Sequence, residues 1–426
     1  ALQISRWDPY DQNTSSVFFD PEWMFDAKEG FDVVIGNPPY LLISKELFLD
    51  VYAKYYKLQE GKPDLYRIFI EKTLELSKSA GILSLITPNT FLTIPSCEKI
   101  RRYLVNNTTF VSIVNYDQTV FESASVNNVV FVVKVAMPKR NTLLKVTDLI
   151  KNKSLFDANS FLIEQFQSQR NSKYEINIFS DRDAGKLIIK IIDSSCRLSD
   201  IENVDISLGL QPYHNTIHSD HEMKSRFLHS KIKENENFLI ELGGKNIHKY
   251  YISELQDNFL NFSAELYTKP NIKFFNGERL VIREIVSDTL IVGLTDKKML
   301  FNKSCYIVKS RNESYTNKYL LAILNSKLIG YYVKNTGDKS KQTIFPRITM
   351  RTLKSLPIIK TEHQQIITSI IDDIIINSKS DYDTSLLERK IDELVFKLYN
   401  LTYEEVKMVD PDFWLSEEEY ENVRIE

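Results

Sequence analysis

Short apolar runs alternate with amphipathic segments over the first 140 residues of the chain. Continuous runs rich in β-branched residues predict buried strands, whereas apolar residues spaced three and four apart predict helices. The strands expected on this basis cover residues 31–36, 81–86, 110–115 and 126–135, and the helices cover residues 65–76 and 97–105. Strands and helices that alternate in this way are typical of an α/β layer with parallel strands.

After about residue 150 the pattern changes to irregular polar segments with short strand-like runs. Such strands are expected at 280–285, 290–292 and 304–308. One helix is expected over 316–332, because its apolar residues recur at helical spacing and a terminating Asn-Thr-Gly follows at 335–337. The middle of the chain therefore predicts a mixed α+β domain.

The C-terminal part of the chain is predicted to be helical. Isoleucines between Ile366 and Ile375 form one apolar stripe, and apolar residues between Leu387 and Leu398 form a second. Ser385 and Glu388 have the spacing of a capping box at the start of the second helix. The predicted domains are an α/β domain over residues 1–145, a mixed α+β domain over 146–360 and a helical segment over 361–426.

With 426 residues, 43% hydrophobic and 26% charged, the composition is that of a globular protein large enough for two or three domains. No apolar run reaches the ~18 residues needed to span a bilayer, and no signal-peptide pattern is found, so we expect no membrane association. Cys97, Cys196 and Cys305 are far apart and odd in number, which argues against a disulfide framework or a cysteine-based metal site. We therefore expect a protein of the reducing cytoplasm.

The net charge of −3 is unevenly distributed. Residues 381–426 carry 14 Asp and Glu against 5 Lys and Arg, a balance of −9, so residues 1–380 carry −3 minus −9, or +6. Between 331 and 354 the only acid is Asp338, and the basic residues are Lys334, Lys339, Lys341, Arg347, Arg351 and Lys354. Such a cluster is suited to phosphate groups, although a solvated basic loop has the same composition.

The motif Asn37-Pro38-Pro39-Tyr40 directly follows the first predicted strand. Both prolines lack an N–H, fix their own φ and force an extended conformation on the residue before them, so the segment is stiff. The Asn37 side-chain oxygen and the Pro38 carbonyl can each accept one hydrogen of a planar amino group, while Tyr40 stacks on the attached ring. Accepting both hydrogens frees the nitrogen lone pair for attack on an electrophilic methyl group. The alternative is an ordinary Pro-Pro turn without chemistry.

Three motifs, in order, resemble those of the γ-class N6-adenine DNA methyltransferases. They are the strand and loop from Phe31 to Tyr40, the triplet Asp64-Leu65-Tyr66, and the run from Gly81 to Asn89 that ends in Thr-Pro-Asn. The stretch from Trp7 to Trp23 resembles the segment that leads into the catalytic motif of type IIG restriction-modification enzymes.

A further resemblance to these type IIG enzymes lies near the end of the second predicted domain. Residues 320–327, 345–348 and 356–358 resemble their C-terminal DNA-specificity domain. The resemblance implies a partial S-adenosylmethionine-dependent methyltransferase sheet, then a mixed α+β DNA-specificity domain and a helical C-terminal tail. It also implies double-stranded DNA as a partner and site-specific adenine methylation as the activity of the full-length enzyme.

The resemblance implies a role for each matching residue. Asn37 and Pro38 hold the amino group of an adenine flipped out of the duplex, and Tyr40 stacks on that base. Phe121 packs against the same base, and Phe69 contacts the adenine ring of S-adenosylmethionine. For both phenylalanines a plain core position is the alternative. An Asn at the head of the motif, where cytosine-modifying members more often carry Ser, favours adenine N6 as the methylated atom.

Because the resemblance implies a DNA-specificity domain, Arg, Lys and Gln residues in the second half of the chain are candidates for DNA contacts. Arg and Gln side chains form bidentate contacts with guanine and adenine edges. The candidates for reading DNA are Gln211, Arg283, Lys341, Gln342 and Arg347. For each of them a phosphate contact or a plain surface position is the alternative.

Enzymes of this class bind S-adenosylmethionine with a Gly-rich Phe-x-Gly-x-Gly turn upstream of the catalytic strand. Only Gly30 and Gly36 precede Asn37 in this chain, and no such turn is present. We therefore expect the chain, which begins at Ala1, to be the C-terminal part of a longer enzyme and to be inactive alone. The missing N-terminal portion would be a partner, and strand 31–36 should lie at an open edge of a short sheet.

Other interpretations stay open. The chain could be a DNA-specificity module without catalysis, or a methyltransferase acting on glutamine in proteins or guanine in RNA, because those enzymes also use Asn-Pro-Pro-Tyr. The long domain at 146–360 disfavours the latter. His214, His218 and His221 could bring three imidazoles together, but Pro212 and polar neighbours indicate a loop without a fourth metal ligand. No convincing nuclease motif is found.

Overall fold

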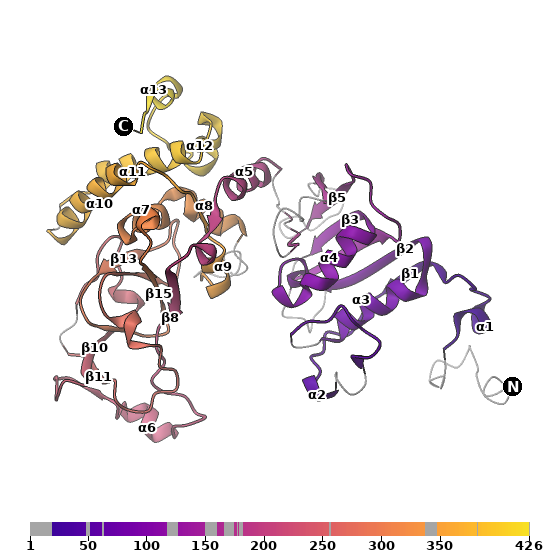
Figure 1. Cartoon of the computed structure of the whole chain (residues 1–426), viewed down its shortest axis with the longest axis horizontal. Helices are drawn as coiled ribbons and strands as arrows, with labels where there is room; N and C mark the ends of the chain where they lie inside the picture. The colour runs from indigo at the N-terminus through magenta and orange to yellow at the C-terminus, as the bar shows by residue number, and fades with distance from the viewer. Residues whose placement is uncertain are drawn as a thin grey trace. The chain divides into compact units, whose positions relative to one another are not determined.

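The computed structural model describes residues 19–47, 52–61, 64–116, 127–149, 160–165, 174–176, 178, 182–254, 257–336, 347–380 and 382–425. The chain divides into two compact units, Ala1–Arg182 and Asp183–Glu426. The first is an α/β unit built on one sheet, and the second is a mixed α+β unit that ends in helices, so the predicted fold class is confirmed (Figure 1). Within the described residues, no helix is long and apolar enough to cross a membrane.

The first unit is built on a six-stranded sheet with the order β1-β2-β4-β3-β5-β6. The strands are β1 (Phe31–Gly36), β2 (Ser77–Pro88), β3 (Thr109–Tyr116), β4 (Asn128–Lys134), β5 (Leu143–Asp148) and β6 (Ser160–Glu164). The β1–β2 and β3–β5 pairs are parallel, whereas β4 runs antiparallel to both of its neighbours. The four strands predicted in this region are confirmed, and β2 extends further toward the N-terminus than expected.

Two helices of the first unit cover one face of this sheet. The helices are α1 (Pro21–Phe25), α2 (Lys45–Leu47), α3 (Leu65–Leu76) and α4 (Glu98–Asn107), with 3-10 turns η3 (Asn89–Leu92) and η4 (Pro95–Cys97). Ile70 of α3 and Leu104 of α4 belong to a buried core that includes Leu83, Phe131 and Ile113 of the sheet. This core supplies the hydrophobic stabilisation that holds the helical layer on the sheet.

The opposite face of the sheet carries apolar side chains that remain accessible. Val33 and Ile35 of β1 are 54% and 76% exposed, and Val33 is paired with Ile82 of β2. Ile82 and Val130 are only half-buried. β1 is the edge strand among the described strands, as expected. The prediction that it is a buried strand is wrong, because no described layer covers its outer face.

Two four-stranded sheets form the core of the second unit, with the orders β14-β10-β11-β9 and β13-β12-β15-β8, and β7 pairs with β16. The strands are β7 (Cys196–Arg197), β8 (Val204–Leu208), β9 (His229–Ser230), β10 (Phe238–Leu242), β11 (Phe259–Asn261), β12 (Arg279–Arg283), β13 (Val292–Thr295), β14 (Leu300–Phe301), β15 (Cys305–Ser310) and β16 (Pro357–Ile358). Leu242 and Phe301 from one sheet share a buried core with Val281 and Ile307 from the other. The strand predicted at 290–292 starts later, at Val292.

One helix of the second unit, α7 (Asn317–Asn325), packs on its β13-β12-β15-β8 sheet, and further helices pack on α7 and on one another. The helices of this unit are α5 (Arg182–Asp193), α6 (Asp220–Ser225), α7, α8 (Lys327–Thr336), α9 (Met350–Lys354), α10 (Gln364–Lys379), α11 (Ser385–Leu398), α12 (Tyr403–Val409) and α13 (Glu417–Asn422), with 3-10 turns η7 (Leu198–Asp200), η8 (Gly244–Asn246), η9 (Ile272–Phe275) and η10 (Glu313–Tyr315). α7 packs on β12 and β13, α10 packs on α7, and α11 packs on α8 and α10 (Figure 1).

The single helix predicted over 316–332 is in fact two helices. Ser326 is extended, with φ −68° and ψ 154°, and separates α7 from α8. The Lys327 N–H at the start of α8 donates to Asp392 Oδ1 of α11 at 2.8 Å. A carboxylate at a helix N-terminus satisfies an otherwise free backbone donor, so a contact from a distant helix stabilises the break.

The capping box predicted at Ser385 and Glu388 is also wrong. Thr384 is the N-cap residue of α11, and its hydroxyl lies 2.7 Å from Glu388 Oε1. Ser385 is the first helical residue, and its N–H donates to Asp383 Oδ1 at 2.9 Å. The helix starts as expected, but neighbouring residues bind its first backbone donors.

Asp392 should make the stability of the second unit depend on pH. Burial raises the pKa of its carboxyl to about 7, although the Lys327 N–H and the ammonium groups of Lys249 and Lys327 oppose the shift. Between roughly pH 4 and 7 the folded chain binds more protons at this group than the unfolded chain, so stability falls as pH rises through this window and levels off above it. D392N, which retains the acceptor oxygen, should flatten the profile and raise the free energy of unfolding at pH 8 by about 1–3 kcal/mol.

Urea unfolding of the two proteins between pH 5 and 8 measures this difference. D372N is a matched control, because the Asp372 side chain is 48% exposed in its pair with Lys318. Its profile should parallel that of the parent chain. Parallel profiles for D392N and the parent chain would contradict the prediction.

Candidate functional site

The Asn37–Tyr40 segment, here called the NPPY loop, leaves the end of β1 and meets the start of α3. Pro38 is buried within the loop, whereas Asn37 is exposed. Just beyond the loop, the Leu41 carbonyl accepts the Leu65 N–H at 3.0 Å. The Asp-Leu-Tyr triplet at the start of α3 therefore lies beside the loop, so two motifs that are separate in the sequence are neighbours in the structure.

Tyr40 packs edge-on against Tyr66 of this triplet, with ring centroids 6.1 Å apart and ring planes at 80°. Tyr66 is buried, and its hydroxyl lies 3.4 Å from the Cys97 sulfur. The Tyr40 hydroxyl is buried as well, and it has no hydrogen-bonding partner among the described residues. Burial raises the pKa of Tyr40 to about 12, so the ring is neutral at physiological pH.

Strand pairing brings further polar residues to the end of the sheet where the NPPY loop lies. Gly36 of β1 pairs with Leu85 of β2, so these parallel strands end at the same edge. Pro88 at the end of β2 pairs with Asn128 at the start of β4, which also pairs with Tyr116 at the end of β3. The ends of four strands therefore meet at one edge.

Thr87, Asn89, Asn115 and Asn128 form what we call the polar rim of this edge. The Asn89 N–H donates to the Asn127 carbonyl at 2.8 Å, and Asn89 Nδ2 lies 3.5 Å from Asn115 Oδ1. Thr87 is fully buried, and its hydroxyl has no partner in the part of the chain that the structure describes. Sequence reasoning identified Thr87 and Asn89 but missed the other two. Their positions at the ends of predicted strands were the available signal.

Charged residues on the inner side of α3 hold the surrounding loops. Arg67 donates to the carbonyls of Glu60 at 2.9 Å and Ser96 at 2.7 Å. Glu71 accepts the Leu58 N–H at 3.0 Å. Burial raises the pKa of Asp64 at the helix start, although the Tyr66 N–H and Arg67 oppose this. These bonds fix the frame in which the NPPY loop is held.

The two glycines that precede Asn37 are closely packed. A Cβ on Gly30 would lie 2.7 Å from the Leu76 carbonyl oxygen, and one on Gly36 would lie 2.9 Å from Leu85 Cδ2. These glycines therefore allow β1 to pack closely on its neighbours and do not open a space for a ligand. Phe69, the predicted cofactor contact, is 42% exposed, so a core position does not describe it.

The structure describes three of the predicted DNA-reading residues, which are Arg283, Arg347 and Gln211. Arg283 ends β12, and its Cγ would lie 3.3 Å from a Cβ placed on Gly244. Arg347 is 55% exposed and lies 3.7 Å from Glu284. Gln211 donates its side-chain N–H to the Tyr213 carbonyl at 3.0 Å. Lys341, Gln342 and the predicted base contact Phe121 lie outside the described residues.

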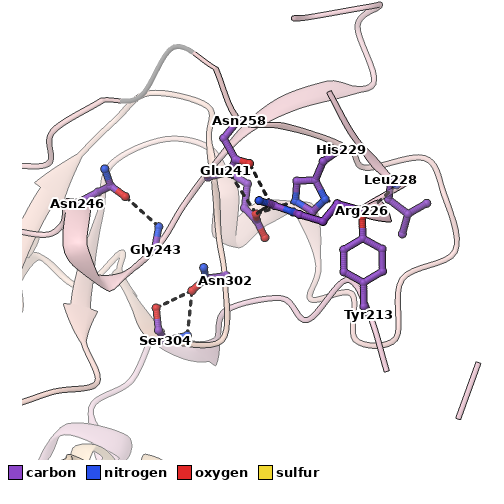
Figure 2. Close-up of polar contacts among 10 residues, drawn as sticks. All are labelled: Tyr213, Arg226, Leu228, His229, Glu241, Gly243, Asn246, Asn258, Asn302 and Ser304. Atoms are coloured by element: carbon purple, nitrogen blue, oxygen red, sulfur yellow. Dashed lines mark hydrogen bonds and ion pairs between the residues drawn. The ribbon is translucent and has the colours of Figure 1, made fainter. Parts of the chain in front are cut away.

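A cleft of about 840 Å³ opens in the second unit beside η8. Its charged lining consists of Arg226, His229, Lys231, Glu241, Lys245 and Asp257. Figure 2 shows several of these side chains together with Asn258 and Asn302, which also line the cleft. Sequence reasoning missed this site, because its residues come from separate segments that share no motif.

A buried hydrogen-bond chain lies along one side of the cleft (Figure 2). The Leu228 N–H donates to the Tyr213 hydroxyl at 3.0 Å, and this hydroxyl lies 2.7 Å from His229 Nδ1. His229 Nε2 lies 2.8 Å from Glu241 Oε2. A carboxylate can only accept hydrogen bonds, so the His229 Nε2–H donates to Glu241 Oε2. Glu241, only 4% exposed, is thereby held in one position.

The three histidines considered for a metal do not converge. His214 stacks on Tyr267 with ring centroids 4.0 Å apart, whereas His218 packs against Tyr213. His221 lies on α6. Among the described residues, no group of three His, Cys, Asp or Glu is arranged to hold a metal ion.

Two families of known proteins match this chain, one in each of its two units. Residues 5–121 match the Eco57I restriction-modification methylase family, and this range contains the NPPY loop, α3 and β2. Residues 239–358 match the TaqI-like C-terminal specificity domain. The chain thus resembles Eco57I-type methylases in its first unit and the TaqI-like specificity domain in its second. Glu241 and Asn258 of the cleft lie within the matched range 239–358, and Arg226 and His229 precede it.

Individual relatives extend the similarity over most of the chain. A Methanocaldococcus jannaschii protein assigned as a type II restriction enzyme and methyltransferase is 26% identical over 87% of this chain and 31% of its own length. The type II methyltransferase M.BstVI of Geobacillus stearothermophilus is 31% identical over 41% of this chain and 33% of its own length. The chain thus spans about a third of the length of these two relatives.

The similarity to a solved structure concerns the fold. The structure of MmeI, a type IIL restriction-modification enzyme in complex with DNA, matches with a TM-score of 0.54 and 12% identity. The match covers 96% of this chain and 60% of the MmeI chain. The order of a methylase-like sheet, specificity-domain sheets and helices is therefore a known one.

Removal of the Tyr40 hydroxyl tests the packing of the methylase segment at the NPPY loop. Because this hydroxyl is buried without a described partner, Y40F should leave the free energy of unfolding unchanged or raise it by up to about 1 kcal/mol. Y40A also removes the ring that contacts Tyr66 and should lower the free energy of unfolding by about 2–4 kcal/mol. Urea unfolding followed by circular dichroism measures both changes. A loss of more than about 1 kcal/mol in Y40F would mean that the hydroxyl is paired.

Proposed function

We propose that this chain is the base-binding and DNA-selecting part of a site-specific DNA methyltransferase of a type IIG restriction-modification system. The enzyme would transfer a methyl group from S-adenosylmethionine to N6 of a flipped adenine. The observation that carries this proposal is the NPPY loop at the end of an edge strand, beside the polar rim. The matches to the Eco57I methylase family and the TaqI-like specificity domain support it.

The proposed role of the NPPY loop is to hold the target amino group. The Asn37 side-chain oxygen and the Pro38 carbonyl would each accept one N–H of adenine N6, which moves the nitrogen from planar toward tetrahedral and localises its lone pair. Tyr40, steadied by its edge-on contact with Tyr66, would stack on the base. Stacking returns ~1–3 kcal/mol of the few kcal/mol that base extrusion costs. Phe121 is proposed to pack against the same base.

The proposed methyl donor is S-adenosylmethionine, and the Gly-rich turn that binds it in the enzymes this chain resembles has no counterpart before Asn37 in the sequence. We therefore propose that an N-terminal portion of the same polypeptide supplies the Gly-rich turn. The edge position of β1 and the exposure of Val33 and Ile35 support this proposal, because they leave both a free strand edge and an apolar face to be covered. Phe69, exposed on α3, is the proposed contact of this chain to the cofactor's adenine ring.

The specificity domain is proposed to bind double-stranded DNA. Gln211, Arg283, Lys341, Gln342 and Arg347 are its proposed base or phosphate contacts. Among the described ones, Arg347 is the most open to solvent and its partner Glu284 is 3.7 Å away, so its guanidinium is available to a second ligand.

A DNA-specificity module without catalysis is the second candidate function. The observation in its favour is the lack of a Gly-rich turn before Asn37, where Gly30 and Gly36 are the only glycines. A methyltransferase acting on protein glutamine or RNA guanine has no comparable support, because residues 239–358 match a specificity domain.

Calorimetric titration with S-adenosylmethionine tests the proposal that an N-terminal portion of the polypeptide supplies part of the cofactor site. The chain alone is expected to give no binding signal, and the chain extended by the upstream residues of its gene is expected to bind. A dissociation constant below ~1 mM for the chain alone would refute this proposal.

Methyl transfer from tritiated S-adenosylmethionine to duplex DNA tests the role of Asn37. In the extended protein, N37A should slow transfer by about 100-fold or more, because half of the acceptor pair is lost. N107A is the matched control, since Asn107 is an exposed asparagine at the end of α4, and it should transfer at the parental rate. Equal rates for N37A and the parent would contradict the proposed role. If the parent binds duplex DNA selectively but transfers no methyl group, the module without catalysis is the correct function.

A further inference from the structure

Arg226 is held on one side and open on the other. Its Nη2 lies 3.0 Å from Asn258 Oδ1 and 3.8 Å from Glu241 Oε2. Figure 2 shows its side chain extended toward both residues. The Arg226 side chain is nevertheless 55% exposed. The guanidinium therefore has a fixed direction and keeps donors that face solvent in the cleft.

The groups that orient Arg226 are themselves fixed. Glu241 is buried and bound by His229, and Asn258 Nδ2 donates to the Glu241 carbonyl at 2.7 Å. Asn258 thus joins the Glu241 backbone to the Arg226 guanidinium. An arginine oriented in this way loses little conformational freedom when it binds a ligand, which favours selective recognition over loose attraction.

The local fold does not explain an arginine at this position. Arg226 is the C-cap residue of α6 and has φ +51°, a left-handed conformation that glycine adopts more easily. Backbone strain at a residue whose side chain reaches into a cleft is an indication of function.

The charges around Arg226 identify the kind of ligand. DNA offers its guanidinium two pairs of acceptors, phosphate oxygens and the O6 and N7 atoms of guanine in the major groove. Glu241 beside the guanidinium and the exposed Asp257 in the same cleft repel a phosphate but not an uncharged base edge. Lys231 and Lys245, both exposed in the cleft, are point charges suited to the flanking phosphates.

We propose that Arg226 reads a guanine of the DNA target through its O6 and N7 atoms, and that Glu241 and Asn258 are the positioning residues that aim it. This inference rests on the proposed DNA-selecting function and deepens it, because it names a base contact of the cleft. Lys231 and Lys245 bind the DNA phosphates next to this guanine and so fix the position of the chain along the duplex.

Selection of bound duplexes from a randomised DNA pool, with the full chain, tests the proposal. The parent chain should prefer guanine at one position that R226G reads ~5- to 150-fold less selectively, while preferences at other positions persist. Glycine fits the backbone conformation of Arg226, so the melting temperature of R226G should be unchanged or higher, which separates a lost contact from misfolding. K224A, which removes a charge from the same helix, should keep the guanine preference.

Changes to the DNA and to the positioning residues sharpen the test. Replacing the selected guanine by 7-deazaguanine removes the N7 acceptor, and should weaken binding by the parent chain while leaving R226G unaffected. R226K retains the charge but not the planar fork, so it should also lose the preference. E241Q and N258A should weaken the guanine preference more than the overall affinity.

Three outcomes would overturn proposals made here, and they are distinguishable. A uniform loss of affinity in R226G with a shallower salt dependence would place Arg226 on a phosphate. An unchanged guanine preference in R226G would remove Arg226 from the interface. Either result leaves the proposed function intact. A parent chain that binds no duplex, or binds without sequence preference, would overturn the DNA-selecting function and this inference with it.

Discussion

Parallel pairing of β1 with β2 decides where the NPPY loop lies. Parallel strands end at the same edge of a sheet, so the loop meets Thr87 and Asn89 at the end of β2. Insertion of the antiparallel β4 between β2 and β3 extends this edge to Asn115 and Asn128. The two prolines of the loop have no N–H and cannot continue the ladder, so the strand pairing ends at Gly36.

The first unit has apolar side chains on both faces of its sheet, but the described helices cover only one face. α3 and α4 bury the face that contains Leu83 and Phe131. On the other face, Val33 and Ile35 of the edge strand are largely exposed. An apolar face next to an unpaired strand edge favours contact with further protein, because both the hydrophobic surface and the free backbone groups are satisfied by a covering layer. The length of the relatives, about three times the matched part, is consistent with such a layer.

The second unit contains buried carboxyl groups that hydrogen bonds hold in place. A buried charge is tolerated only when hydrogen bonds satisfy it. Around the cleft, His229 and Asn258 bind Glu241, and Tyr213 holds His229, which together create a rigid support for Arg226. In the helical layer, Asp392 satisfies the first donor of α8. The first network points a cation toward solvent, whereas the second joins two helices, although both use a buried carboxylate.

Local patterns in the sequence determined the elements, because hydrophobic periodicity depends on residues only a few positions apart. They predicted β1, α3 and β4, and the stiffness of the NPPY loop follows from its prolines alone. The tertiary structure decided which residues that are distant in the sequence contact one another. The break at Ser326 has a local signal in Ser326 itself, whose Oγ accepts the Ile329 N–H at 3.4 Å, but the first donor of α8 is bound by Asp392, 65 residues beyond Lys327. The support of Arg226 likewise joins β9, β10, the residue before β11 and a helix end, so only strand pairing could bring Glu241 and Asn258 beside it. The sequence by itself thus determined the elements and the stiffness of the loop, and the fold alone decided the neighbours of the loop and the cleft.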